Sequence, residues 1–238
     1  MADSHDIVID VRGVQKDYHG LRPLRVQHLE VHQGESVALL GFDQAAAEVF
    51  VNLITAATIP DAGEIRTFGQ PTTAIKDADT WLQSLDRFGI LSERAVVLDN
   101  MTVADNLTMP VTMSLHDVPD AMRSKIRALA EEVGLPAAQF EQPVAALSPS
   151  ARLRLRLGRA LGPDPRVILS EHPNASLAPG DLASFAADYA RIVTSRAITS
   201  IVLTADRTFA TAIASRILTL QPATGELKPL AGWRRWFS

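Results

Sequence analysis

The chain has 238 residues, of which 47% are hydrophobic and 21% charged, so it has ample length and apolar content for a globular fold. A net charge of −4 gives no broad attraction for nucleic acid, and the absence of cysteine excludes disulfides and thiolate metal sites. We find no secretory signal in the first ten residues and no apolar run long enough to span a bilayer. We therefore expect a cytoplasmic protein that reaches the inner membrane only through partner subunits.

The N-terminal part of the chain predicts strands around one helix. Apolar residues alternate in residues 7–14 and 24–31, as in half-buried strands. Residues 36–41 form a short apolar run, which is typical of a strand buried on both faces of a parallel sheet. Residues 45–57 have the spacing of a helix, and a turn then separates them from a strand at 64–68.

The middle of the chain predicts two amphipathic helices. In residues 118–134 apolar residues recur at helical spacing, and Gly134 is placed to end the helix. Residues 148–162 carry a leucine face and an arginine face: Leu153, Leu157 and Leu161, against Arg152, Arg156 and Arg159. Such an arginine stripe can contact phosphate or an acidic partner, but it is more often a solvated or salt-bridged face.

The last third alternates again between strand and helix. Strands are predicted at 166–170, 200–204 and 216–220, with helices at 182–196 and 208–215 between them. This alternation predicts an α/β core built on a parallel sheet. The helix-rich residues, about 100–162, are then an inserted helical subdomain of one domain spanning 1–230. An aromatic and basic tail at 231–238 either contacts a partner or docks on the domain.

Short motifs spread along the chain resemble those of the ATP-binding subunits of ABC transporters. They occur in that family's order and spacing: GE at 34–35, VALLG at 37–41, NLI at 52–54, PDAGEI at 60–65, TVADNL at 102–107, LS at 147–148 and RAL at 159–161. The resemblance covers almost the whole chain. It implies a P-loop NTPase-like, three-layer α/β fold with a parallel sheet, an N-terminal antiparallel β-subdomain and the helical subdomain.

The segment at the family's phosphate loop, which begins at Gly41 and ends at Val49, lacks that family's chemistry. In register, Ala47 stands at the phosphate-binding lysine, and Glu48 stands at the hydroxyl that holds Mg²⁺. Asp43 and Glu48 place negative charge where phosphates would sit, which costs on the order of several kcal/mol per pair at close range. The segment also reads as a plain helix start capped by Asp43. We therefore expect no bound cofactor.

The remaining family positions carry substitutions as well. By resemblance, Glu93 stands at the Q-loop glutamine, Glu171 at the metal-side aspartate, and His172 at the general base. Ala205 stands at the switch histidine and Ala178 at the D-loop aspartate. A histidine can act as a base, but here it would have no positioned phosphate to serve. We therefore expect no catalytic residue among them.

Two further family positions concern the adenine and the partner's site. Tyr18 stands where the family stacks an aromatic ring on adenine, and it is otherwise an ordinary buried tyrosine. In the signature, Ser148 is kept, but Pro149 replaces a glycine whose N–H lies near the γ-phosphate of the partner's nucleotide. Outside the family motifs, His28 and His32 lie four residues apart without further ligands in sight, so no metal site is expected.

These observations favour one function and leave a second open. The first is a catalytically inactive, ABC-type pseudo-ATPase that is a structural or regulatory part of a membrane-transport or cell-envelope complex. Its partners would be a permease, contacted around residues 93–100, and another ABC subunit in a homo- or heterodimer. The second is an ATP-binding subunit that uses ATP and Mg²⁺ through a divergent site or with an intact partner. A third possibility is that the cleft binds a less anionic ligand.

Overall fold

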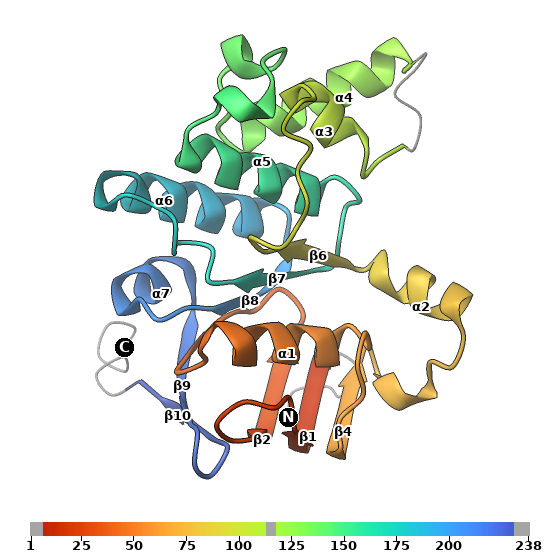
Figure 1. Ribbon diagram of the computed structural model, residues 1–238, viewed down its shortest axis with the longest axis vertical. Helices are drawn as coiled ribbons and strands as arrows, with labels where there is room; N and C mark the ends of the chain where they lie inside the picture. The colour runs from red at the N-terminus through yellow and green to blue at the C-terminus, as the bar shows by residue number, and fades with distance from the viewer. Residues whose placement is uncertain (1–6, 113–117, 231–238) are drawn as a thin grey trace.

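The computed structural model describes residues 7–112 and 118–230, which form two sheets and the helices packed on them (Figure 1). The larger sheet has six strands, in the order β10 (Glu226–Pro229), β9 (Arg216–Gln221), β3 (Ser36–Leu40), β8 (Thr199–Leu203), β7 (Val167–Glu171) and β6 (Phe88–Leu91). Its neighbouring strands are parallel except for the edge strand β10, which is antiparallel to β9. The smaller sheet is antiparallel, in the order β2 (Leu24–His32), β1 (Ile7–Lys16), β4 (Ala62–Thr67) and β5 (Gln70–Pro71).

The parallel sheet separates two apolar cores. Because side chains alternate between the faces of a strand, Val37 and Leu39 of β3 enter one core, while Ala38 and Leu40 enter the other. The first core lies between the two sheets and contains α1 (Gln44–Ile54). The second lies under the helices of the opposite face. The predicted α/β class, the antiparallel N-terminal sheet and the helical subdomain are therefore confirmed.

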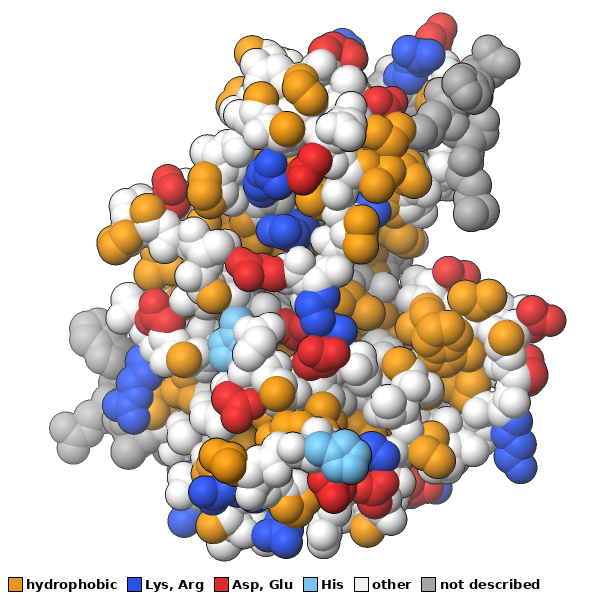
Figure 2. Space-filling model, viewed as in Figure 1, with side chains coloured by type: hydrophobic (Ala, Val, Ile, Leu, Met, Phe, Trp, Pro, Cys, Tyr) orange, Lys and Arg blue, Asp and Glu red, His pale blue; other side chains and the backbone are white. Residues whose placement is uncertain are grey.

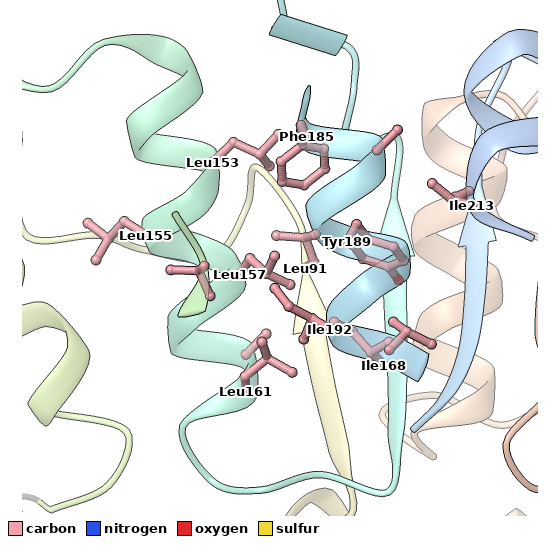
Figure 3. Close-up of a cluster of buried hydrophobic side chains, with 14 of the residues drawn as sticks. Leu91, Leu153, Leu155, Leu157, Leu161, Ile168, Phe185, Tyr189, Ile192 and Ile213 are labelled. Carbon is pink, nitrogen blue, oxygen red and sulfur yellow. The ribbon is translucent and has the colours of Figure 1, made fainter. Parts of the chain in front are cut away.

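Helices form the layer on the far face of the parallel sheet, and Figure 1 shows them above it. They are α3 (Val103–Thr108), α4 (Asp120–Glu132), α5 (Pro149–Leu161), α6 (Pro179–Ser195) and α7 (Arg207–Ile213), with short 3₁₀ turns η2 (Ala137–Gln139) and η3 (Val144–Ala146). The leucine face predicted for α5 is confirmed: in Figure 3, Leu153, Leu157 and Leu161 pack with Phe185 and Tyr189 of α6.

The arginine face of α5 is bonded internally. Arg152 Nη1 lies 2.8 Å from Asp99 Oδ1, and Arg159 Nη1 donates to the Asn106 carbonyl at 2.6 Å. The salt-bridged interpretation is therefore confirmed for Arg152, whereas Arg159 bonds a backbone carbonyl.

Helix ends follow local backbone chemistry. The helix predicted for 45–57 stops at Ile54 because Thr55 Oγ1 bonds the Val51 carbonyl and Ala56 takes a left-handed φ of 56°. Gly134, with φ 79°, follows α4 as the predicted stop. The positions of these ends are decided by single residues rather than by the apolar period.

One part of the fold has no counterpart among the predicted elements. Residues 70–112 contain β5, η1 (Thr72–Ala74), α2 (Ala78–Leu85), β6 and α3, and β10 near the C-terminus was also not predicted. None of the residues of α2 is buried, and Leu82 is 55% exposed. Figure 2 shows the hydrophobic side chains gathered over α2, while acidic and basic side chains are interspersed on this face of the molecule.

Candidate functional site

The turn between β3 and α1 is shaped by a glycine and an aspartate. Gly41 has a φ of 86°, and a Cβ there would lie 2.9 Å from the Leu220 carbonyl oxygen, so only glycine fits. Asp43 caps α1, because its Oδ1 accepts the Ala46 N–H at 2.8 Å, as the sequence predicted. One of the amides that a helix N-terminus offers to an anion is thus already bonded within the chain.

The positions after the turn face the protein interior. Ala47, at the family's lysine position, is 0% exposed in the core between the sheets, and Val49 packs against the same core. Ala47 therefore belongs to the packed side of α1 rather than to an anion-binding surface. The predicted interpretation of this segment as a packing helix start agrees with these contacts.

A cavity of about 340 Å³ opens beside this turn. Half-buried Tyr18 lines it together with Gly41 and Asp43, so the structure brings these three sequence-predicted residues together. Burial raises the pKa of the Tyr18 hydroxyl, and the charge of Asp43 raises it further. Arg22 and Arg25 also line the cavity, and the sequence analysis missed both. They give the cleft two cations that partly offset the negative charge expected to repel phosphate.

A second polar site lies at the carboxyl end of β7, where Glu171 is 1% exposed. Both of its oxygens are engaged by Arg94, with Nη2–Oε1 at 2.5 Å and Nε–Oε2 at 3.1 Å. Ser92 Oγ donates to the same carboxylate at 2.7 Å, and Arg94 Nη1 reaches Glu48 Oε1 at 3.1 Å. One guanidinium thus pairs with both carboxylates that the resemblance assigns to the family's metal positions, and it offsets one of their two negative charges.

The surroundings of Arg94 favour its charged form. Hydrogen bonding to Glu171 raises the pKa of Arg94 above its usual value, and the charges of Glu171 and Glu48 add to the rise, while burial opposes it. Carboxylate and hydroxyl oxygens are also the ligands that Mg²⁺ prefers, so the donor set of Glu48, Glu171 and Ser92 fits such an ion. A metal can bind here only after the guanidinium has moved away.

The other predicted site positions lie apart from the cavity. Glu93 is exposed, and its neighbour Arg94 makes the contacts to the core instead. Ser148 caps α5 by accepting the Ala151 N–H at 3.2 Å, with Pro149 at the first helical position, where its missing N–H costs nothing. These two residues belong to the helical layer and do not line the cavity beside Tyr18.

His172 follows Glu171 in a left-handed conformation, with φ 44°. Its N–H donates to the Leu203 carbonyl at 2.8 Å, which extends the pairing of β7 with β8. Its Nε2 is buried and has no hydrogen-bond partner within the described part of the chain. Ala205 is exposed just beyond β8, and the neighbouring Thr204 Oγ1 donates to Asn174 Oδ1 at 2.8 Å.

A group of possible metal ligands lies on the antiparallel sheet, although none was expected there. Ligand atoms of Asp10, His28 and Glu30 lie within 4.8 Å of one another. The sequence spacing paired His28 with His32, but the acidic residues of the group are Asp10 on the neighbouring strand β1 and Glu30 on β2 itself. Arg12 contacts both carboxylates, at 3.0 Å and 3.6 Å, so the cluster is an exposed ion-pair network.

None of the helices in residues 7–112 and 118–230 combines the length and the hydrophobicity that crossing a bilayer requires. The aromatic and basic residues of the tail, 231–238, lie outside the described residues.

Comparison with known proteins identifies relatives of the chain. The family described as ABC transporter matches residues 24–175. The chain is 29% identical over 202 residues to the phosphonates import ATP-binding protein PhnC of Anaeromyxobacter dehalogenans, covering 80% of this chain and 39% of the relative. It is 30% identical to an uncharacterized ABC transporter ATP-binding protein of Rhizobium meliloti, covering 82% of this chain and 70% of that protein. The chain thus spans less than two thirds of the length of PhnC.

Solved structures share the fold. The ATP-binding cassette MJ0796, a dimer in a post-hydrolysis state with ADP and Pi, superposes with a TM-score of 0.78 at 19% identity, covering 96% of this chain and all of that one. The structure of cbiO1 from Clostridium perfringens, part of the ABC transporter complex cbiONQ, gives 0.79 at 18% identity, covering 93% of this chain and 87% of that one.

The relatives correct one expectation. The sequence analysis predicted no cofactor, but the proteins that match are named ATP-binding proteins, and the MJ0796 structure holds ADP and Pi. The prediction of no cofactor is therefore wrong. The charge repulsion on which it was based is also partly offset, because Arg94 pairs with Glu48 and because Arg22 and Arg25 line the cavity.

Proposed function

Because this chain belongs to the ABC transporter family, we propose that it is a subunit of a membrane-transport or cell-envelope complex that binds an adenine nucleotide without hydrolysing it at its own site. In such a complex it acts as a structural or regulatory component, and the degenerate positions at Ala47, Pro149 and Ala205 belong to that role. Hydrolysis, where the complex carries it out, belongs to an intact partner subunit.

The observation that carries this proposal is the buried alanine at the position that the resemblance assigns to the phosphate-binding lysine. Phosphoryl transfer depends on cations that hold the phosphates and stabilise charge in the transition state. Ala47 is 0% exposed, so it offers no phosphate-binding amine. At the position assigned to the metal, Glu171 is bound by Arg94 and Ser92, so a metal ion reaches this carboxylate only in competition with Arg94.

The case for nucleotide binding rests on the cavity beside Tyr18. The cavity of about 340 Å³ has an aromatic wall at Tyr18, on which a base can stack, and two arginines that can meet phosphate oxygens. The relatives that match this chain are named for binding ATP. We infer that the base and one part of the phosphate chain are held here.

The partners follow from the segment between β6 and α3. Val96 is 70% exposed in this segment, which crosses from the sheet to the helical layer (Figure 1). We infer that a permease subunit contacts residues 93–100 at the cytoplasmic face of the inner membrane. A second ABC subunit, identical or different, pairs with this one, by analogy with the dimer of MJ0796.

Phosphate release from ATP tests the proposal. The purified chain should release phosphate no faster than a buffer blank, while equilibrium dialysis still detects bound ATP. The single change Ala47→Lys should not restore turnover, because the side chain enters a core position. Substantial turnover by the wild-type chain alone would refute the non-hydrolytic role.

A second candidate is hydrolysis through a divergent site, and the buried Nε2 of His172 favours it. An imidazole nitrogen with no partner in the described residues is free to accept a proton from water. In that case turnover appears with Mg²⁺-ATP and disappears in His172→Ala. If turnover instead requires an added partner subunit and survives His172→Ala, the partner holds the catalytic site.

A further inference from the structure

Arg94 joins three segments that are distant in sequence. Its guanidinium binds the end of β7 through Glu171 and the side of α1 through Glu48. Its backbone N–H donates to Ser92 Oγ at 3.1 Å, and Ser92 in turn donates to Glu171. The start of the segment between β6 and α3, residues 92–102, is therefore fastened to the cleft by contacts that converge on one carboxylate.

The far end of this segment is fastened to the helical layer. The side chain of Asn106 bonds both the N–H and the carbonyl of Leu98, at 2.9 and 3.0 Å. Asp99 pairs with Arg152 of α5 at 2.8 Å. Residues 92–102 thus form a link with one end on the cleft and the other on the helices.

The two ends differ in what can release them. The contacts of Leu98 and Asp99 involve no group of the cleft. The contact of Arg94, in contrast, uses both oxygens of Glu171, which is 1% exposed. Arg94 and Ser92 together make three hydrogen bonds to this carboxylate. Because like charges repel strongly at such short range, a cation that binds Glu171 must displace the guanidinium.

We propose that Arg94 is a positioning residue, a latch that holds residues 92–102 on the cleft and that a divalent cation displaces when it binds Glu171 and Glu48. Displacement frees one end of the link while the other stays on the helical layer. The proposal rests on the proposed function only in that the cation arrives with nucleotide.

The test uses Mn²⁺ alone, so that it does not depend on ATP binding or turnover. Wild-type protein and Arg94→Met are titrated with Mn²⁺, and free Mn²⁺ is measured by electron paramagnetic resonance. We expect Arg94→Met to bind Mn²⁺ at least tenfold more tightly than wild type, because no guanidinium competes. Amide hydrogen exchange at residues 92–97 should be faster in the metal-free variant than in wild type.

Two matched variants separate the latch from a general loss of packing. Arg152→Met removes an ion pair from the same link but not from Glu171, so its Mn²⁺ affinity should equal that of wild type. Arg94→Met/Glu171→Gln should lose the gain in affinity, since the ligand itself is gone. If Arg94→Met does not fold, Arg94→Lys serves instead and should bind Mn²⁺ more tightly than wild type, because an ammonium cannot hold both oxygens at once.

The result that would overturn the latch is an affinity for Mn²⁺ in the folded Arg94 variant within twofold of wild type. A gain that persists in the double variant would also overturn it. Failure of the proposed function looks different, because phosphate release from ATP by the wild-type chain leaves the ranking of the Mn²⁺ affinities unchanged.

Discussion

The cavity beside Tyr18 and the polar site at the end of β7 differ in how their charged side chains are placed. The cavity beside Tyr18 is open, with Arg22 and Arg25 in its wall, and Lys16, two residues before Tyr18, forms an ion pair with Asp61. At the end of β7, Arg94 covers and binds the fully buried Glu171. The comparison indicates that the cavity beside Tyr18 is open to a ligand. The carboxylates of Glu48 and Glu171, in contrast, are paired with Arg94 of the same chain.

The largest effect on stability is expected from removing the ion pair between Arg94 and Glu171. Arg94→Met leaves the Glu171 charge buried without a partner, and breaking a buried pair costs about 3–5 kcal/mol. Because Arg94 itself is 40% exposed, we expect the lower limit, about 3 kcal/mol, in the free energy of unfolding by urea. Arg94→Met/Glu171→Gln should recover most of this loss. Additive losses in the double variant would contradict the pairing.

The next effect concerns the glycine at the wall of the open end. Gly41→Ala forces a left-handed alanine whose Cβ meets the Leu220 carbonyl at 2.9 Å, so we expect a loss of about 2 kcal/mol. Gly34→Ala is the control, because Gly34 has a similar φ of 74° but no neighbour within 4 Å. It should cost about 1 kcal/mol. Equal losses of stability in the two variants would mean that the close approach of Leu220 in β9 to Gly41 is unimportant.

A smaller effect is expected in binding rather than in stability. Tyr18→Ala removes the aromatic wall and should weaken ATP binding about tenfold, which corresponds to about 1.4 kcal/mol. Tyr18→Phe keeps the ring and should bind within about twofold of wild type. The control is Leu21→Ala, since Leu21 is fully exposed at the rim. Calorimetric titration measures all three, and unchanged affinity in Tyr18→Ala would place the base elsewhere.

The smallest effect is a dependence of stability on pH that comes from Asp61. Lys16 and the Asp17 N–H both bond Asp61 at 2.7 Å, which lowers the pKa of its carboxyl, the Lys16 bond being the larger cause. A lowered pKa means that this contribution to stability is present above the unfolded pKa of 3.8 and is lost as pH falls through the folded value. In Asp61→Asn the difference in melting temperature from wild type should shrink below pH 4. A difference in melting temperature that does not change with pH would show that Asp61 does not cause this dependence.

The sequence predicted the layers of the fold well because buried strands and helices carry apolar periods. Residues 36–41 and 148–162 are examples, and both are close to the observed β3 and α5. It failed for α2 because that helix has only eight residues and buries none of them. The helix α3 had a usable signal that was not used, since Thr102 and Asp105 form a reciprocal capping box.

The site was predicted in position but not in chemistry. Tyr18, Gly41 and Glu171 were assigned from family spacing. The structure places Tyr18 and Gly41 at the cavity, while Glu171 lies at the polar site at the end of β7. Arg94 was missed because it lies 77 residues from Glu171, and no local pattern reveals an ion pair between distant segments. The wrong expectation of no cofactor came from reading Asp43 and Glu48 as bare charges beside a missing lysine.

The central claim is that this subunit holds ATP without cleaving it, and a single-turnover experiment tests it most directly. Excess protein is mixed with radiolabelled ATP and Mg²⁺, the bound fraction is isolated by rapid filtration, and the nucleotide is then identified by chromatography. We predict that the bound label remains ATP over an hour. Conversion of the bound label to ADP within minutes, abolished in His172→Ala, would contradict the account.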